Sequence, residues 1–198
     1  MGRVFSMCLE AAVASPFLFL LLELLDKRLF HNRTRTAWYF ILAVYFSAVY
    51  AVVGLPDAMY VRFAPNCNLV PFAYMFSDYK NSLLNVLLFL PLGVLLPLLW
   101  ETFRKFHWTF LFGLCFSGTI ELLQLFSFRA TDVNDLMTNT FGAILGWCMG
   151  MLLSKLWFKT IPSGKTRDVY IVAGLSFAFM FFFQPFIIRL VHWILERI

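Results

Sequence analysis

Charged residues are scarce in this chain of 198 residues: Asp, Glu, Lys and Arg make up 14% of it, against 61% hydrophobic residues. Soluble domains carry about 25% charged residues and about half apolar ones. A single soluble core of this size would leave much of the apolar surplus in contact with water. The composition therefore excludes an ordinary soluble domain and indicates a chain that spans a membrane several times.

Several signatures of chemistry are also missing. The three histidines form no Ser–His–Asp arrangement, and there is no glycine-rich phosphate loop and no histidine cluster. The four cysteines fit no metal-binding spacing, and three of them fall inside apolar runs, which leaves Cys67 as the one expected to be exposed. The net charge of +5 comes from residues that lie mainly between apolar runs. There they orient helices, so nucleic acid is not an expected partner.

Windows of about 19 residues predict six transmembrane helices, the first of which is the weakest because Glu10 interrupts it. The expected spans are Val4–Leu25, Ala37–Leu55, Leu83–Trp100, Trp108–Phe126, Leu136–Phe158 and Tyr170–Ile194. We expect an all-α fold, a polytopic membrane bundle in three parts. These are two N-terminal helices (1–60), a core of three helices (61–158), and a loop with a C-terminal helix (159–198).

The distribution of basic residues predicts the orientation of these helices. Ten Lys and Arg residues lie in or beside the first, third and fifth loops, and six lie on the opposite side. Because positive charge marks the cytoplasmic side, the long second loop and residues 128–146 are expected to face outward.

The end of the fourth span carries a costly polar pair. Glu121 and Gln124 are three residues apart and share one face of the helix. A carboxylate in a span costs about 2.5–3.5 kcal/mol or more if it faces lipid. We expect Glu121 to point into the bundle, either toward a functional cavity or toward a partner that merely stabilises the packing.

The fifth span begins with a second polar group. Asp132 and Asp135 have the spacing of a capping box, which explains one carboxylate by helix capping alone. Asp132, Asp135 and Asn139 continue as a stripe into three glycines, Gly142, Gly146 and Gly150. Small residues at this spacing allow another helix to approach closely. We therefore expect the polar end of the stripe to be pressed against a partner helix. On the third span, Asn85 fits a hydrogen bond between helices and a cavity wall equally well.

Four stretches in order along the chain strongly resemble the VanZ-like family. They are "NLVPF" (68–72), "NVLLFLPLG" (85–93), "IELLQ" (120–124) and "RATDVNDLMTNTFG" (129–142). The resemblance covers about residues 66–150, with two departures. A glycine often precedes the arginine in the family, and Phe128 does so here. The spans before residue 56 and after residue 160 carry no motif of the family. It implies a multi-pass protein of the bacterial plasma membrane, associated with resistance to lipoglycopeptides such as teicoplanin. No established catalytic mechanism comes with it.

The polar residues singled out because they are costly to place in a membrane span match the motif positions of the family. The candidate acid/base groups, which are also the candidate oxygen ligands of a divalent cation, are Glu121, Asp132 and Asp135. The candidate binding residues are Asn85, Gln124, Arg129 and Asn139. A further metal ligand set is not identifiable from the sequence.

Three hypotheses for the function follow. In the first, the site binds or modifies an anionic envelope lipid, such as a polyprenyl phosphate, at the outer leaflet, with Arg129 and either Arg62 or Lys80 holding the phosphate. In the second, the polar groups are structural and the protein acts as a non-enzymatic scaffold for other envelope components. The third, a transporter of a small solute or lipid, ranks last because no inverted repeat is visible. Whether the protein is an enzyme and how it oligomerises stay open at this point.

Overall fold

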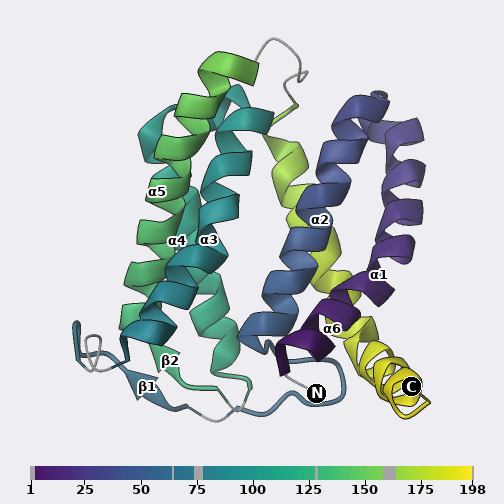
Figure 1. Cartoon of the computed structure of the whole chain (residues 1–198), viewed down its shortest axis with the longest axis vertical. Coiled ribbons are helices and arrows are strands. Elements are labelled where there is room, and N and C mark those ends of the chain that lie inside the picture. Colours follow the sequence, from purple (N-terminus) through teal and green to yellow (C-terminus); the bar gives the residue numbers. More distant parts are fainter. Residues whose placement is uncertain (1–2, 64, 74–77, 128, 158–163, 198) are drawn as a thin grey trace. The chain divides into compact units, whose positions relative to one another are not determined.

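The computed structural model describes residues 3–63, 65–73, 78–127, 129–157 and 164–197, and these are mostly helical (Figure 1). Each predicted span forms a helix, which confirms the all-α fold class. The helices are α1 (Arg3–Leu25), α2 (Arg33–Val53), α3 (Tyr79–Leu99), α4 (Phe106–Gln124), α5 (Val133–Trp157) and α6 (Arg167–Leu195).

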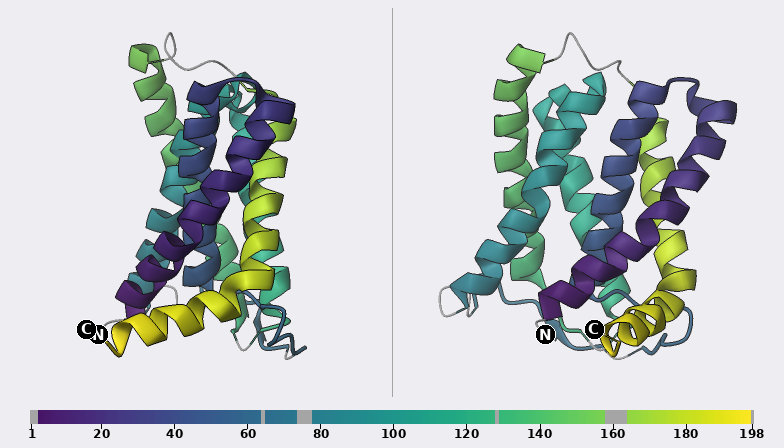
Figure 2. Two further views of the ribbon diagram at one scale, coloured as in Figure 1. Left: turned by 90° about the vertical axis from the view of Figure 1, so that its right-hand side faces the viewer. Right: turned by 45° about the vertical axis from the view of Figure 1, so that its right-hand side comes forward.

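Five of the described helices, α2 to α6, are long and apolar enough to cross a membrane, which supports a multi-pass membrane protein. Helix α1 is not among these five, and its crossing of the membrane stays a prediction. In α6 the apolar stretch ends at Leu190. Figure 2 shows α6 changing direction toward its C-terminal end, and Pro185 lies inside this helix, where it removes a backbone hydrogen bond.

The chain divides into two compact units. The terminal unit comprises residues 1–62 and 167–198, and contains α1, α2 and α6. The central unit comprises residues 63–166, and contains α3, α4 and α5.

In the terminal unit, polar side chains fix the turn between α1 and α2. A short π-helical segment, Asp26–Phe30, leads into Asn32, which caps α2 by accepting the N–H of Arg35 at 3.0 Å. Asp26 Oδ1 accepts the Thr36 hydroxyl at 2.6 Å and the Asn32 N–H at 2.9 Å. The Thr36 hydrogen bond is the main cause of a lowered pKa of Asp26. This turn is therefore held by capping chemistry and needs no functional explanation.

Two buried polar pairs connect the helices of the terminal unit. The Tyr39 hydroxyl donates to Asp168 Oδ2 at 2.9 Å and so connects α2 to the start of α6. Glu10, which weakens the first predicted span, is 8% exposed and accepts Gln184 Nε2 at 3.1 Å. Its polar cost is thus offset by a partner on α6, which the sequence pattern of α1 alone does not show.

In the central unit, glycines bring α3 and α5 into close contact. A Cβ atom added at Gly142 or Gly146 would lie 2.3 Å from the carbonyl oxygen of Val86 or 2.2 Å from that of Leu90. Gly93 on α3 is equally confined, 2.1 Å from the carbonyl oxygen of Ala143. The partner expected for the glycine stripe is therefore α3, and both helices contribute small residues to the contact.

Candidate functional site

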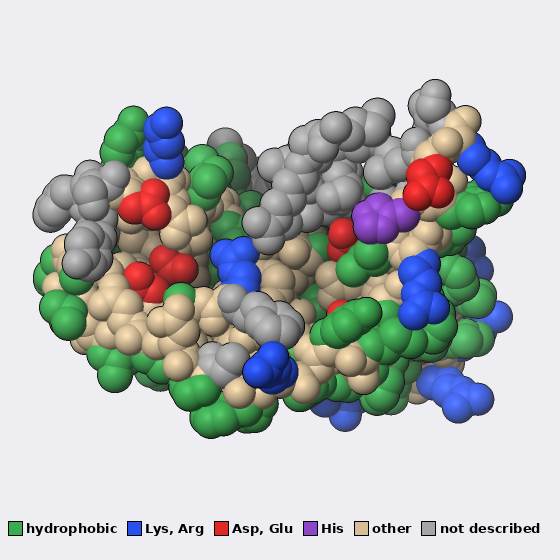
Figure 3. All heavy atoms as spheres, turned by 90° about the horizontal axis from the view of Figure 1, so that it is seen from below, with side chains coloured by type: hydrophobic (Ala, Val, Ile, Leu, Met, Phe, Trp, Pro, Cys, Tyr) green, Lys and Arg blue, Asp and Glu red, His purple; other side chains and the backbone are tan. Residues whose placement is uncertain are grey.

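Two very short strands bring distant loops together at one end of the central unit. Strand β1 (Cys67–Asn68) pairs in parallel with β2 (Thr131–Asp132), and the Thr131 N–H donates to the carbonyl of Asn66 at 2.8 Å. This end is where α3 and α5 begin and α4 ends. Figure 3 views the molecule from that side and shows acidic and basic side chains at the surface between apolar ones. The motif stretches that are far apart in the sequence thus meet here.

Glu121 connects α4 to this strand pair. Its side chain is 6% exposed, and Oε2 accepts the backbone N–H of Asp132 at 2.8 Å. The carbonyl of Glu121 also accepts the Thr131 hydroxyl at 2.9 Å. The expectation that Glu121 points into the bundle is correct, and one of its two oxygens has a structural partner.

Asp132 caps α5, but the predicted capping box forms only in part. Its Oδ1 accepts the N–H of Asn134 at 2.8 Å, as expected of a residue just before the helix. The return bond differs from the prediction, because Glu121 rather than Asp135 accepts the Asp132 N–H. Both carboxylate oxygens of Asp132 also accept the Asn68 amide, at 3.2 and 3.1 Å, which joins β2 to β1.

Asp135 is thereby available for a different contact. Its Oδ1 accepts the Asn85 amide of α3 at 2.7 Å. The second oxygens, Oδ2 of Asp135 and Oε1 of Glu121, have no hydrogen-bond partner within the described ranges. Each of these two carboxylates is therefore held by one oxygen and keeps the other for a ligand, a proton or water.

Arg129 supplies positive charge beside these carboxylates. It is half-buried, its backbone N–H donates to Ser127 Oγ at 3.3 Å, and its charge interacts with those of Glu121 and Asp135. No ion pair of Arg129 within 4.0 Å is found in the part of the chain that the structure describes. Phe128, one of the departures from the family pattern, lies outside that part.

We call five residues of this end the polar cluster: Asn85, Glu121, Arg129, Asp132 and Asp135.

Gln124 and Asn139, the other two predicted binding residues, are buried more deeply. Each is 3% exposed. Asn139 donates to Ser117 Oγ of α4 at 3.0 Å, and its own Oδ1 has no hydrogen-bond partner among the described residues. The predicted stripe of α5 is therefore divided: Asp135 and the glycines contact α3, whereas Asn139 contacts α4. A helix packed between two neighbours presents different faces to each, which a single stripe does not reveal.

Asn134 is essential to the architecture of this end and is absent from the predicted site. Its side chain is 5% exposed, accepts the N–H of Phe72 at 2.7 Å, and donates to the carbonyl of Ala73 at 2.9 Å. Phe72 has a positive φ of 62° and belongs to the "NLVPF" stretch. Asn134 thus holds this loop against the start of α5. Both partners of Asn134 are backbone groups, so the side-chain pattern of the sequence carries no signal of this contact.

The geometry gives little support to a metal site formed by the protein alone. Within the described ranges, no group of three or more His, Cys, Asp or Glu side chains is arranged to hold a metal ion. Two free carboxylate oxygens, on Glu121 and Asp135, are fewer than the six oxygen ligands that Mg²⁺ or Ca²⁺ takes. A divalent cation here would need ligands from a bound molecule or water.

Comparison with known proteins agrees with this arrangement of motifs. The family model described as VanZ/LLP1 matches residues 36–159, which include the whole polar cluster. The chain belongs to the VanZ/LLP1 family. It is also similar to Protein VanZ of Enterococcus faecium, with 38% identity over 111 residues, which cover 54% of this chain and 64% of that protein. The match thus spans less than two thirds of that relative. No solved structure matches the chain.

Proposed function

We propose that the polar cluster binds the phosphate head group of an anionic envelope lipid at the outer leaflet, and that this lowers susceptibility to lipoglycopeptides such as teicoplanin. The observation that carries the proposal is the set of groups without an internal partner. Arg129 makes no close ion pair, and Glu121 and Asp135 each keep one oxygen free in the described part of the chain. Arginine is suited to phosphate because its planar group donates two parallel hydrogen bonds.

The charge balance of the cluster restricts how a phosphate binds. The cluster holds three carboxylates and one guanidinium, and like charges at short range oppose the approach of another anion. A proton on Glu121 or Asp135, or a divalent cation shared between a carboxylate and the phosphate, relieves this repulsion. The same protons would serve acid/base chemistry on a phosphate ester, so binding and modification both remain compatible with the cluster.

The test compares two variants, each of which loses one basic side chain, in a glycopeptide-sensitive host. Arg129→Gln should return teicoplanin susceptibility to that of the empty vector and leave vancomycin susceptibility unchanged. Lys105→Gln removes the same charge from an exposed position just before α4, at its opposite end, and should protect as the wild type does. Full protection by correctly folded Arg129→Gln would contradict the proposal. Binding of the purified protein to vesicles that contain an anionic phospholipid, measured with and without a chelator, shows whether a divalent cation takes part.

The outward orientation of the cluster has a test of its own. Cys67 is exposed in β1, next to Asn68, which contacts Asp132. Cys115 and Cys148 are exposed as well, contrary to the expectation that Cys67 alone would be, and both lie within spans on the helix surface. A membrane-impermeant maleimide should label Cys67 on intact cells, and Cys67→Ser should abolish that signal. Labelling of Cys67 only after permeabilisation would assign the cluster to the cytoplasmic side.

A scaffold without a ligand is the second candidate, favoured by the structural bonds of Glu121 and Asp132. Both carboxylates hold backbone or amide groups of the loops, so part of the cluster stabilises the fold. In this alternative, each cluster substitution should lower protection only in proportion to its loss of thermal stability in detergent. A large loss of protection at unchanged stability would exclude it.

A further inference from the structure

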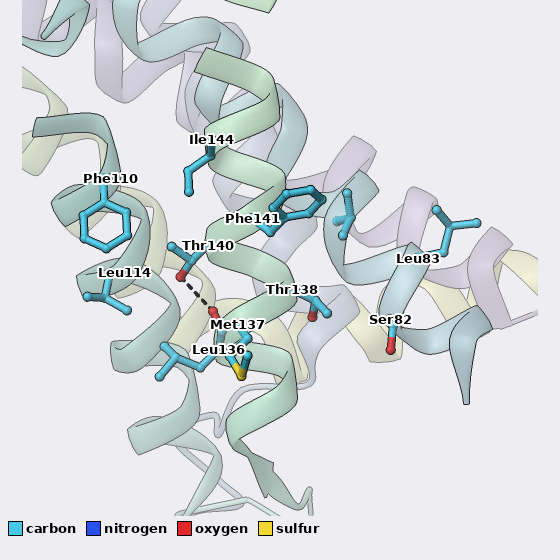
Figure 4. A pocket seen from close by; sticks show the side chains of 11 residues that line it. Ser82, Leu83, Phe110, Leu114, Leu136, Met137, Thr138, Thr140, Phe141 and Ile144 are labelled. Atoms are coloured by element: carbon cyan, nitrogen blue, oxygen red, sulfur yellow. Dashed lines mark hydrogen bonds between the residues drawn. The ribbon is translucent and has the colours of Figure 1, made fainter. Parts of the chain in front are cut away.

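An open cavity of about 750 Å³ follows α5 directly beside the polar cluster. Figure 4 shows α5 at its centre, with lining side chains on both sides of the helix. Leu136 lies on the side that faces Leu114 of α4, whereas Phe141 lies on the side toward Leu83 of α3. The cavity therefore borders α5 on two flanks.

The walls offer a ligand almost no polar contact. Three lining residues carry hydroxyl groups: Ser82, Thr138 and Thr140. Each hydroxyl donates to a carbonyl of the preceding turn, at 3.3, 2.8 and 2.7 Å respectively. Because these donors are already engaged, the cavity presents methyl groups and apolar side chains, which suit a hydrocarbon occupant.

The depth of the cavity corresponds to one leaflet. Its lining residues on α5 run from Leu136 to Ile144, and α5 begins at Val133. At 1.5 Å per residue this stretch is about 12 Å long. The hydrocarbon core of a bilayer is about 30 Å thick, so one leaflet accounts for about 15 Å. The cavity thus lies in the leaflet on the side of the polar cluster, where lipid chains have direct access to it.

One end of the cavity, nearest the starts of α3 and α5, adjoins the polar cluster. The Thr138 hydroxyl is also 3.2 Å from the carbonyl of Asp135, and Ser82 lies one turn before Asn85. Asn85 and Asp135 are joined at 2.7 Å, are both half-buried, and directly precede the lining residues Val86 and Leu136. Lys80, in the first turn of α3, is exposed near this entrance. The walls are apolar along the leaflet, and Lys80 and Arg129 supply positive charge among the carboxylates at the head-group level.

We propose that the two acyl chains of an anionic diacyl phospholipid straddle α5 in this cavity, with the lipid phosphate at the polar cluster. The lining on both flanks of α5 favours a lipid with two chains over a polyprenyl phosphate, whose single chain would occupy one flank. The inference rests on the proposed function, because the cluster must hold the head group. It adds the class of lipid and the location of its chains.

Photo-crosslinking tests the position of the chains. Benzoylphenylalanine replaces Phe141 on one flank, Leu136 on the other, or Leu152, which is 67% exposed on α5 and does not line the cavity. The protein is reconstituted in phosphatidylcholine vesicles with a minor fraction of phosphatidylglycerol and an equal amount of polyprenyl phosphate, and the adducts are identified by mass spectrometry. Phosphatidylglycerol should be enriched several-fold over its bulk fraction at positions 141 and 136. Position 152 should reproduce the bulk composition.

Two results would overturn the inference: bulk composition at all three positions, or polyprenyl phosphate as the enriched adduct.

A cavity-filling variant separates the chain site from the head-group site. Leu114→Trp should reduce the phosphatidylglycerol retained by the purified protein in native mass spectrometry, as Arg129→Gln should, whereas Leu152→Trp should not. Retention lost in Arg129→Gln but unchanged in Leu114→Trp would leave the proposed function standing and refute the cavity as the chain site. No retention by the wild type would refute the head-group site itself.

Discussion

The two halves of α5 make different kinds of contact with their neighbours. From Gly142 to Gly150, the helix lies so close to α3 that even a methyl group at Gly142 or Gly146 would meet backbone atoms within 2.3 Å. From Val133 to Asn139, polar side chains reach to α3, α4 and the loops through separate hydrogen bonds. Packing fully explains the glycine half, from Gly142 to Gly150, but does not fully explain the polar half, from Val133 to Asn139.

The two halves differ in whether polar atoms are left without a hydrogen-bond partner. In the glycine half no space remains between α5 and α3. In the polar half, Asp135 Oδ2 and Asn139 Oδ1 have no hydrogen-bond partner within the described ranges. Unpaired polar atoms near the membrane are expensive, and natural proteins retain few of them. The surplus therefore indicates function, and the following substitutions test this contrast in order of their expected cost in stability.

The largest effect is expected at the glycine half. Gly142→Ala should destabilise the protein by about 1–3 kcal/mol or more, because the new Cβ meets the Val86 backbone and α3 has to move away. The matched control is Gly174→Ala in α6, where nothing lies within 4 Å of the new Cβ. There the gain in helix propensity should stabilise the protein slightly. Thermal unfolding in detergent measures both; equal stability of the two variants would mean that α3 and α5 are not in close contact.

The next effect is expected at Asn134. Asn134→Ala removes both bonds to the loop at Phe72 and Ala73 and leaves a backbone N–H without its partner, at a cost of about 1–3 kcal/mol. The loop should become more sensitive to limited proteolysis near Phe72, which is itself 57% exposed. Asn81→Ala, at an exposed position in the first turn of α3, serves as the control and should cut at the wild-type rate. An unchanged cutting rate in Asn134→Ala would show that other contacts hold the loop.

The sequence predicts the features that depend on local pattern. Apolar runs locate the helices, and the spacing of Gly142, Gly146 and Gly150 identifies a packing face. A carboxylate within a span is costly if it faces lipid, which predicts that Glu121 points into the interior, and Glu121 is indeed buried. These follow because hydrophobicity and helical period act over a few turns, and both are visible in one stretch of sequence.

The contacts that assemble the cluster are less visible. Strands β1 and β2 have two residues each, too few for an alternating pattern, yet their pairing brings Asn68 to Asp132. This register decides that Glu121, rather than Asp135, receives the Asp132 N–H. The Glu121–Asp132 bond joins two different elements and is set by tertiary packing, so capping rules alone assign the wrong partner.

The Thr36–Asp26 hydrogen bond of the terminal unit shows how much a purely structural bond contributes to the free energy of unfolding. Thr36→Val should cost about 1 kcal/mol, because Asp26 loses the hydroxyl donor. That bond lowers the pKa of Asp26, so its contribution is present above the unfolded pKa of about 4 and is lost as the pH falls through the folded value. The difference in unfolding temperature between Thr36→Val and the wild type should therefore be largest at neutral pH and vanish in acid. A difference independent of pH would show that Asp26 is not the partner that matters.

The smallest effect on stability, and the sharpest test of the contrast, is expected from Asp135→Asn. The new amide can still accept the Asn85 hydrogen bond at Oδ1, so the unfolding temperature should stay close to that of the wild type. It removes the negative charge and the second carboxylate oxygen, which are the groups that packing does not use. Teicoplanin protection and retention of phosphatidylglycerol should then both fall, although the fold is intact. Asp132→Ala should do the opposite and lose stability first, because both of its oxygens hold Asn68 and one caps α5. If Asp135→Asn protects fully, the surplus oxygen has no function and the polar half of α5 is a packing device like the glycine half.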